Sequence, residues 1–255
     1  MSNTKASLFD AGINAFAQSI SLIHPIAGIA GVAMVPILSN AKEKMFPRNL
    51  SEREDNRIQM VFEGIVSKIN DNLKKGLVPR DDESYYSPTD IGIPHAQEIL
   101  EGVLLKAREE FRNKKLVFYT NFFANLCFDE TISFEHANFL LNIISRLSFR
   151  QFAILAYISD GKSVATGKWD ASFKSMKDSR LLRYFAFYSE YIDLYNARLI
   201  IQTTAIPGFA LGMSDTNISS LGRSIVNLLE LDNIPMQDIK DIGNHLNAIA
   251  AILSS

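Results

Sequence analysis

The residue types that most often do chemistry are few and scattered in this sequence. It holds four histidines, His24, His95, His136 and His245, and a single cysteine, Cys127. None of the histidines stands in a His-Glu-x-x-His, Glu-x-x-His or Cys/His spacing, so we expect no metal site and no other cofactor. Cys127 lies in the apolar stretch FFANLCFDE with no candidate base close by in the sequence, which favours a buried, inert thiol over a nucleophile.

Motifs for phosphate binding and for nucleophilic catalysis are also missing from the sequence. There is no G-x-x-x-x-G-K-[ST], no G-x-G-x-x-G and no G-x-S-x-G pattern. Gly28 and Gly31 follow no predicted strand and bring no lysine with them. Neighbouring carboxylates such as Asp81 and Asp82 lie on stretches that we expect to be solvated. The sequence therefore predicts a protein that is not an enzyme.

The composition is that of a globular protein with a sizeable core. The chain has 255 residues, of which 47% are hydrophobic and 21% charged, and a net charge of −2. This charge creates no overall attraction to nucleic acid or to anionic membranes. The single cysteine excludes a disulfide within the chain, and the N-terminus does not look like a secretory signal. We expect a cytoplasmic protein, with membrane association as an alternative.

Apolar residues recur at every third or fourth position along most of the chain, which predicts amphipathic helices. The pairs Ser51/Glu54 and Ser148/Gln151 have the spacing of a capping box at a helix start. The predicted helical segments are 51–73, 94–111, 114–128, 134–147, 149–159, 181–199, 217–231 and 235–253. Residues 74–92 and 160–180 are polar and rich in helix breakers, so they are predicted to be loops.

The fold prediction is a mainly α protein with two halves. Residues 1–147 form a helical half with an apolar N-terminal segment. Residues 148–255 form a winged-helix-like half in which one short hairpin, centred on Pro207-Gly208 in LIIQTTAIPGFALG, follows an aromatic helix. A helical bundle half packed with a winged-helix-like half is therefore the expected architecture.

The apolar segment Ser21–Leu38 has two interpretations. Counted from Ala17 to Leu38, the apolar stretch is long enough for a membrane span, but Pro25 and Pro36 interrupt helix hydrogen bonding within it. The other interpretation is a buried helix or an interface with a second copy or another protein. The residues assigned to this membrane or interface segment are Ile26, Gly28, Ile29, Gly31, Val32 and Val35.

A short basic run offers a nucleic-acid interpretation of the second half. In winged-helix modules the helix before the hairpin reads DNA. The equivalent helix here carries Glu190 and Asp193 and few cations, which disfavours contact with phosphates. The candidate DNA contacts are the cations that precede this helix, Lys174, Lys177, Arg180 and Arg183.

Several motifs resemble a known bacterial family. They are Ala124-Asn125-Leu126, then Leu147-Ser148 with Gln151, Ile154 and Leu155, and the later set Asp193, Leu194, Leu199, Ile200, Leu221, Gly222, Ile225, Leu228 and Leu229. Over about residues 20–232 the chain is similar to proteins of the Abi-alpha type, a family assigned to phage abortive infection. The resemblance implies a bacterial cytosolic protein in phage defence and carries no catalytic residues.

The expected function is therefore a non-enzymatic bacterial defence or toxicity protein that acts through contact with a protein partner or a second copy, with membrane engagement as an addition. The alternative is a DNA-binding regulator that uses the winged-helix-like half.

Overall fold

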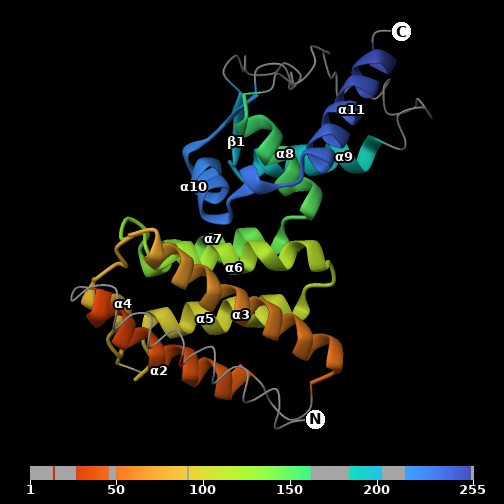
Figure 1. Cartoon of the computed structure of the whole chain (residues 1–255). Helices are drawn as coiled ribbons and strands as arrows, with labels where there is room; N and C mark the ends of the chain where they lie inside the picture. Colours follow the sequence, from red (N-terminus) through yellow and green to blue (C-terminus); the bar gives the residue numbers. More distant parts are fainter. Residues whose placement is uncertain are drawn as a thin grey trace. The chain divides into compact units, whose positions relative to one another are not determined.

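The protein is mainly helical. The computed structural model describes residues 14, 27–45, 50–90, 92–161, 184–202 and 216–253. These residues form ten α-helices, two short 3-10 helices and one two-stranded antiparallel sheet (Figure 1). The prediction of a mainly α protein with one short hairpin is confirmed.

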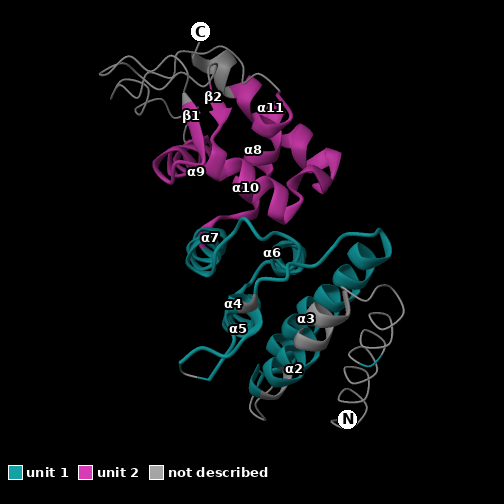
Figure 2. Ribbon diagram, turned by 90° about the vertical axis from the view of Figure 1, so that its left-hand side faces the viewer, with its two compact units in different colours: residues 1–145 teal, residues 146–255 magenta. Residues whose placement is uncertain are grey.

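The chain divides into two compact units, residues 1–145 and residues 146–255 (Figure 2). This division lies two residues before the boundary that the sequence predicts, between residues 147 and 148. Each unit has its own buried core and is described separately.

Unit 1 is a set of packed helices. Its elements are α2 (Ala27–Met45), α3 (Glu52–Lys74), α4 (Glu83–Tyr86), α5 (His95–Glu109), the 3-10 helix η1 (Asn113–Lys115), α6 (Leu116–Leu126) and α7 (Phe134–Arg146). Helix α3 packs against both α5 and α6, and α2 packs against α5. The largest fully buried side chains of this unit include Phe62, Tyr85, Tyr119, Phe122 and Phe123.

Helix α3 begins at the capping box that the sequence predicts. The Ser51 hydroxyl accepts a hydrogen bond from the Glu54 backbone N–H, and the Glu54 carboxylate accepts one from the Ser51 N–H. Ile58, Ile65 and Ile69 lie on the buried face. Local capping and the apolar stripe therefore both determine where α3 starts and which side it buries.

Helix α2 continues through Pro36, although a proline is expected to interrupt a helix. Met34, Ile37 and Leu38 are each at most 3% exposed, and Ala41 is fully buried. Burial of these side chains on both sides of the proline offsets the hydrogen bond that the proline cannot donate. The second half of α2 is thus part of the core of unit 1.

Unit 2 is built around one central helix. Its elements are α8 (Phe149–Ser159), α9 (Phe185–Asn196), β1 (Ile200–Gln202), β2 (Thr216–Ile218), α10 (Ser220–Leu229), the 3-10 helix η5 (Leu231–Asn233) and α11 (Met236–Leu253). Helix α8 packs against α9, α10, α11 and β2. In the sheet, Ile200 pairs with Ile218 and Gln202 with Thr216. The predicted turn at Pro207-Gly208 lies outside the described residues.

The start of α8 is joined to α9 by a polar cluster. The second predicted capping box is confirmed, because Ser148 and Gln151 exchange backbone and side-chain hydrogen bonds. The Ser148 hydroxyl also donates to Glu190 Oε1 over 2.7 Å, and Arg150 forms an ion pair with the same carboxylate. Gln151 Nε2 donates to the Glu190 backbone carbonyl. The cap of one helix thereby positions the next one.

Candidate functional site

The predicted membrane or interface segment is described only in part. Gly28, Ile29, Gly31 and Val32 lie on α2, and Val35 is half-buried, while Ile26 lies outside the described residues. Within the part of the chain that is described, no single helix is long and apolar enough to cross a membrane, although α7 and α8 reach that length and composition when taken together. The role of this segment stays a prediction.

The predicted DNA contacts Lys174, Lys177, Arg180 and Arg183 all lie outside the described residues. Helix α9 itself can be assessed. Its exposed positions are Ala186, Ser189, Asp193 and Asn196, so the solvent face of the helix carries one carboxylate and no cation.

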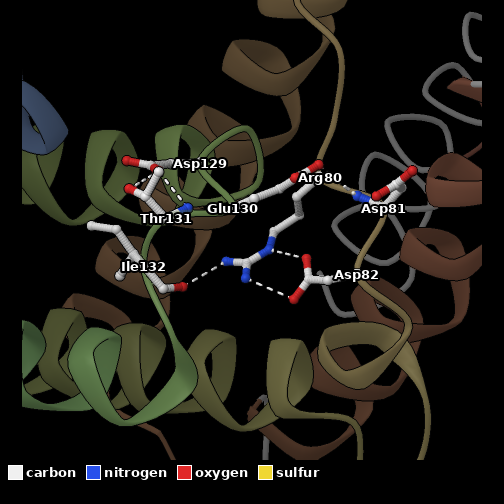
Figure 3. Close-up of polar contacts among 7 residues, drawn as sticks. All are labelled: Arg80, Asp81, Asp82, Asp129, Glu130, Thr131 and Ile132. Atoms are coloured by element: carbon white, nitrogen blue, oxygen red, sulfur yellow. Dashed lines mark hydrogen bonds and ion pairs between the residues drawn. The ribbon is translucent and has the colours of Figure 1, made fainter.

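A buried arginine holds the segment that joins α3 to α5 (Figure 3). The Arg80 side chain is 2% exposed, and its Nε and Nη2 donate to the two oxygens of Asp82 over 2.6 and 2.8 Å. Its Nη1 donates to the Ile132 carbonyl over 3.1 Å. Burial disfavours the charged guanidinium, but the hydrogen bonds to Asp82 and the electrostatic interactions with Tyr85, Asp82 and Tyr86 together outweigh it. The pKa of Arg80 therefore lies above its ordinary value.

Backbone contacts around Arg80 complete this anchor. The Arg80 N–H donates to the Cys127 carbonyl, and the Asp81 N–H donates to a Glu130 carboxylate oxygen over 3.4 Å. The Arg80 guanidinium also lies 3.8 Å from the centre of the Tyr85 ring. The predicted loop, residues 74–92, is therefore held to the α6–α7 connection by hydrogen bonds.

Cys127 is buried beside this anchor. It is 1% exposed, and burial raises the pKa of its thiol from the ordinary 9.0 to about 12. Burial also raises the pKa values of Tyr85 and Tyr86. The geometry agrees with the expectation of an unreactive thiol, because a cysteine attacks as the thiolate.

A polar hollow of about 480 Å³ opens next to the anchored segment. Its lining includes Ser84, Ser87, Thr89, Asp90, His95 and Glu98. His95 Nδ1 lies 3.2 Å from Glu98 Oε2, and the imidazole stacks on the Phe134 ring. Within the described residues no hydroxyl is hydrogen-bonded to this imidazole, so the hollow holds a histidine–carboxylate pair without a hydroxyl aligned for attack.

A second hollow, of about 420 Å³, lies in unit 2 between α8 and α11. We call it the α8–α11 hollow, and its lining includes Tyr157, Met236, Ile239, Lys240, Asn244 and Asn247. Among these residues Ile239 is 7% exposed, whereas Met236 is 59% exposed. A Cβ atom at Gly243 would lie 3.3 Å from Tyr157 Cε2, so the glycine keeps the tyrosine ring close to α11.

The two hollows offer different chemistry. The first presents hydroxyls and carboxylates, and the second presents a tyrosine, a methionine and amides. Among the described residues no three His, Cys, Asp or Glu side chains come together as metal ligands. Neither hollow was found from the sequence. The only signal for the second is the helical spacing of Met236, Lys240, Gly243 and Asn247, which is also that of an ordinary solvent-facing stripe.

The fold and these sites define a mainly α protein of two compact units with a candidate contact surface in unit 2. Comparison with protein-family models, with curated proteins and with solved structures found no match to this chain.

Proposed function

We propose that this chain acts through contact with another protein, as a bacterial defence or toxicity protein, and not by catalysing a reaction. The α8–α11 hollow is the observation that carries the contact. The assignment to phage defence rests on the resemblance to the Abi-alpha type. The two parts of the proposal are tested separately.

The hollow has the composition of a protein-binding surface. Tyrosine and methionine are enriched in the centres of protein interfaces, and Tyr157 and Met236 line the hollow together with the buried Ile239. The amides of Asn244 and Asn247 each offer donors and an acceptor. We infer that an apolar side chain of the partner enters the hollow while these amides bond to the partner's backbone.

The charges of the hollow favour a protein over a nucleic acid. Lys240 is its single cation. A nucleic-acid surface needs several Lys or Arg side chains, because most contacts go to phosphates. The exposed face of α9 carries Asp193 as its only charge, which also disfavours binding to nucleic acid.

The experiment is a phage challenge of bacteria that express the intact chain. Asn244→Arg places a long charged side chain in the hollow and should lower protection at least tenfold, while the melting temperature of the purified protein stays unchanged. Asn142→Arg is the matched control, since it makes the same change at an exposed position of α7 in the other unit. Its protection should equal that of the wild type.

Each part of the proposal has its own contrary result. Full protection by Asn244→Arg contradicts the contact at the hollow. If the wild-type chain neither protects against any phage tested nor slows growth, the defence assignment is wrong.

A DNA-binding regulator is the second candidate function. The order of α8, α9, the β1–β2 hairpin and α10 favours it, because winged-helix modules place a helix just before the hairpin. Binding of a labelled duplex should then weaken steeply between low and moderate salt. The double variant Lys177→Glu/Arg180→Glu should abolish it, and no binding at low salt removes this candidate.

A further inference from the structure

Two tyrosine hydroxyls in helix α4 are buried without a hydrogen-bond partner. Among the described residues no group bonds to the hydroxyl of Tyr85 or to that of Tyr86, although both oxygens are shielded from solvent. The one other buried side-chain atom without a partner in this part of the chain is Arg57 Nε, and the same guanidinium donates through Nη1 to the Arg108 carbonyl. The two neighbouring tyrosines are therefore an exception, since buried hydroxyls are normally hydrogen-bonded.

The unpaired hydroxyls weaken the packing of α4. Each hydroxyl loses its hydrogen bonds to water on burial and gains none in return, whereas a phenylalanine would bury the same ring without this cost. Tyr85 is 1% exposed, and its ring meets the Tyr86 ring edge to face, with the centroids 5.2 Å apart. A helix of four residues is not stable by itself, so packing against α5 and α2 is what keeps α4 folded.

The chain is held firmly just before α4. The Asp82 carboxylate accepts two hydrogen bonds from Arg80, and the Arg80 guanidinium also bonds to the Ile132 carbonyl (Figure 3). The guanidinium lies 3.8 Å from the centre of the Tyr85 ring, which favours the packed position of that ring. Asp82 is thus the fixed point from which α4 begins.

The chain is held again just after α4. The Thr89 N–H and hydroxyl both donate to the Ile93 carbonyl, over 3.2 and 2.9 Å. Pro88 pairs with Pro94 in an antiparallel bridge that leads directly into α5. The segment between the two fixed points is residues 83–87, and we call it the α4 latch.

The α4 latch contributes to the lining of the first hollow. Ser84 and Ser87 belong to the latch, whereas His95 and Glu98, which also line the hollow, belong to the first turn of α5. His95 is held in place by its contact with Glu98 and by stacking on the Phe134 ring. Movement of the latch therefore changes the width of the hollow while the α5 residues stay in place.

We propose that the α4 latch opens as a local unit while the rest of unit 1 stays folded, and that this opening controls access to His95 in the first hollow. In the closed state the rings of Tyr85 and Tyr86 are buried and their hydroxyls lack partners, whereas in the open state water bonds to both hydroxyls. The free-energy gap between the two states is therefore smaller than it would be with phenylalanine, and the open state is more populated. The latch lies in unit 1 and is independent of the α8–α11 hollow.

The experiment is hydrogen exchange of the full chain, followed by mass spectrometry. The amides of residues 83–87 should exchange faster than the amides in the middle of α3, which open only when unit 1 unfolds. Tyr85→Phe and Tyr86→Phe should each slow exchange of the latch amides about fivefold or more, because an unpaired hydroxyl is no longer buried in the closed state.

Tyr119→Phe is the matched control. Tyr119 is also 1% exposed, but its hydroxyl is hydrogen-bonded to Glu110, so the same substitution removes a hydroxyl that has a partner. This variant should have a lower melting temperature and unchanged exchange of the latch amides.

Access to the hollow is measured by modification of histidines with diethyl pyrocarbonate, located by mass spectrometry of peptides. His95 should react more slowly in Tyr85→Phe and Tyr86→Phe than in the wild type. His136 and His245 do not line this hollow, so they should react at unchanged rates and serve as references within the same protein.

Three results would overturn the proposal. The first is exchange of the latch amides at the rate of the α3 amides, because the latch then opens only with unit 1. The second is unchanged or faster latch exchange in both Tyr85→Phe and Tyr86→Phe, because the hydroxyls then have partners in the closed state. The third is an unchanged reaction of His95 in variants whose latch exchange is slower, because opening then does not control access to the hollow.

Discussion

Substitution of Gly222 by alanine should push α10 away from Leu199, the residue just before β1. A Cβ atom at this position would lie 2.1 Å from the Leu199 backbone oxygen and 2.9 Å from Ile218 Cδ1. The first distance is more than about 1 Å shorter than a normal contact, and a backbone oxygen cannot rotate away as a side chain can. Helix α10 must therefore move.

Movement of α10 weakens the hydrogen bonds that join its N-cap residue, Ser219, to the carbonyls just before β1. The Ser219 N–H donates to the Leu199 carbonyl over 3.0 Å, and the Ser219 hydroxyl donates to the Arg198 carbonyl over 2.6 Å. The same hydroxyl accepts from the Gly222 N–H. The two bonds to the carbonyls of Arg198 and Leu199 depend on the close approach that the glycine permits, whereas the cap bond to Gly222 is local to α10.

The cost can be estimated from these terms. Overpacking costs about 1–3 kcal/mol, and the two weakened hydrogen bonds cost about 1 kcal/mol each. The higher helix propensity of alanine returns about 1 kcal/mol. We expect the free energy of unfolding to fall by about 3 kcal/mol, which lowers the melting temperature by about 6–12 °C.

Thermal unfolding followed by circular dichroism measures this loss, and hydrogen exchange of the α10 amides locates it. Gly102→Ala is the matched control, since its Cβ would meet only the end of the Leu141 side chain, at 3.2 Å. The control should be neutral or stabilising by up to about 1 kcal/mol. A Gly222→Ala protein as stable as the control, with unchanged exchange in α10, would refute the reasoning.

Three further outcomes can be checked by urea unfolding. Ser51→Ala should cost about 1 kcal/mol through the lost cap, since the bond from its hydroxyl to the Glu54 carboxylate is exposed to solvent. Ser148→Ala should cost about 2 kcal/mol, because its hydroxyl donates to a part-buried carboxylate of α9; equal costs would contradict this. Lys115→Met should cost about 3–5 kcal/mol by leaving the buried Glu110 carboxylate uncompensated, and adding Glu110→Gln should recover most of that loss. Burial raises the pKa of the Cys127 thiol from 9.0 to about 12, so the neutral thiol is favoured in the folded protein. The contribution of this thiol to the free energy of unfolding is complete below pH 9 and is lost as the pH rises toward 12. The free energy of unfolding of Cys127→Ala should lack this part of the decline.

Helix positions could be predicted because the interactions that determine them are local. A capping box joins residues three apart, so the starts of α3 at Ser51 and of α8 at Ser148 follow from the sequence and agree with the structure. An apolar stripe repeats every third or fourth residue for the same reason. The mainly α fold and the short hairpin could therefore be predicted from the sequence.

The candidate contact surface could not be predicted in this way. Tyr157 and Gly243 meet because α8 and α11 pack together, and no local pattern encodes that pairing. Phe111 is 79% exposed, which is likewise invisible in the sequence, where its spacing placed it on the apolar stripe of segment 94–111. Whether an apolar residue is covered depends on which helix lies against it.

Arg80 and Gly222 show the same limit in the interior. In the sequence Arg80 stands in a polar stretch with two prolines that is typical of a solvated loop, yet the carbonyl of Ile132 and the side chain of Asp82 hold it in the core. In the sequence no turn motif accounts for a glycine at position 222. The structure accounts for it, because the Leu199 carbonyl lies where a Cβ atom would be. Residues three or four apart meet in any helix, whereas residues tens of positions apart meet only once the elements have packed.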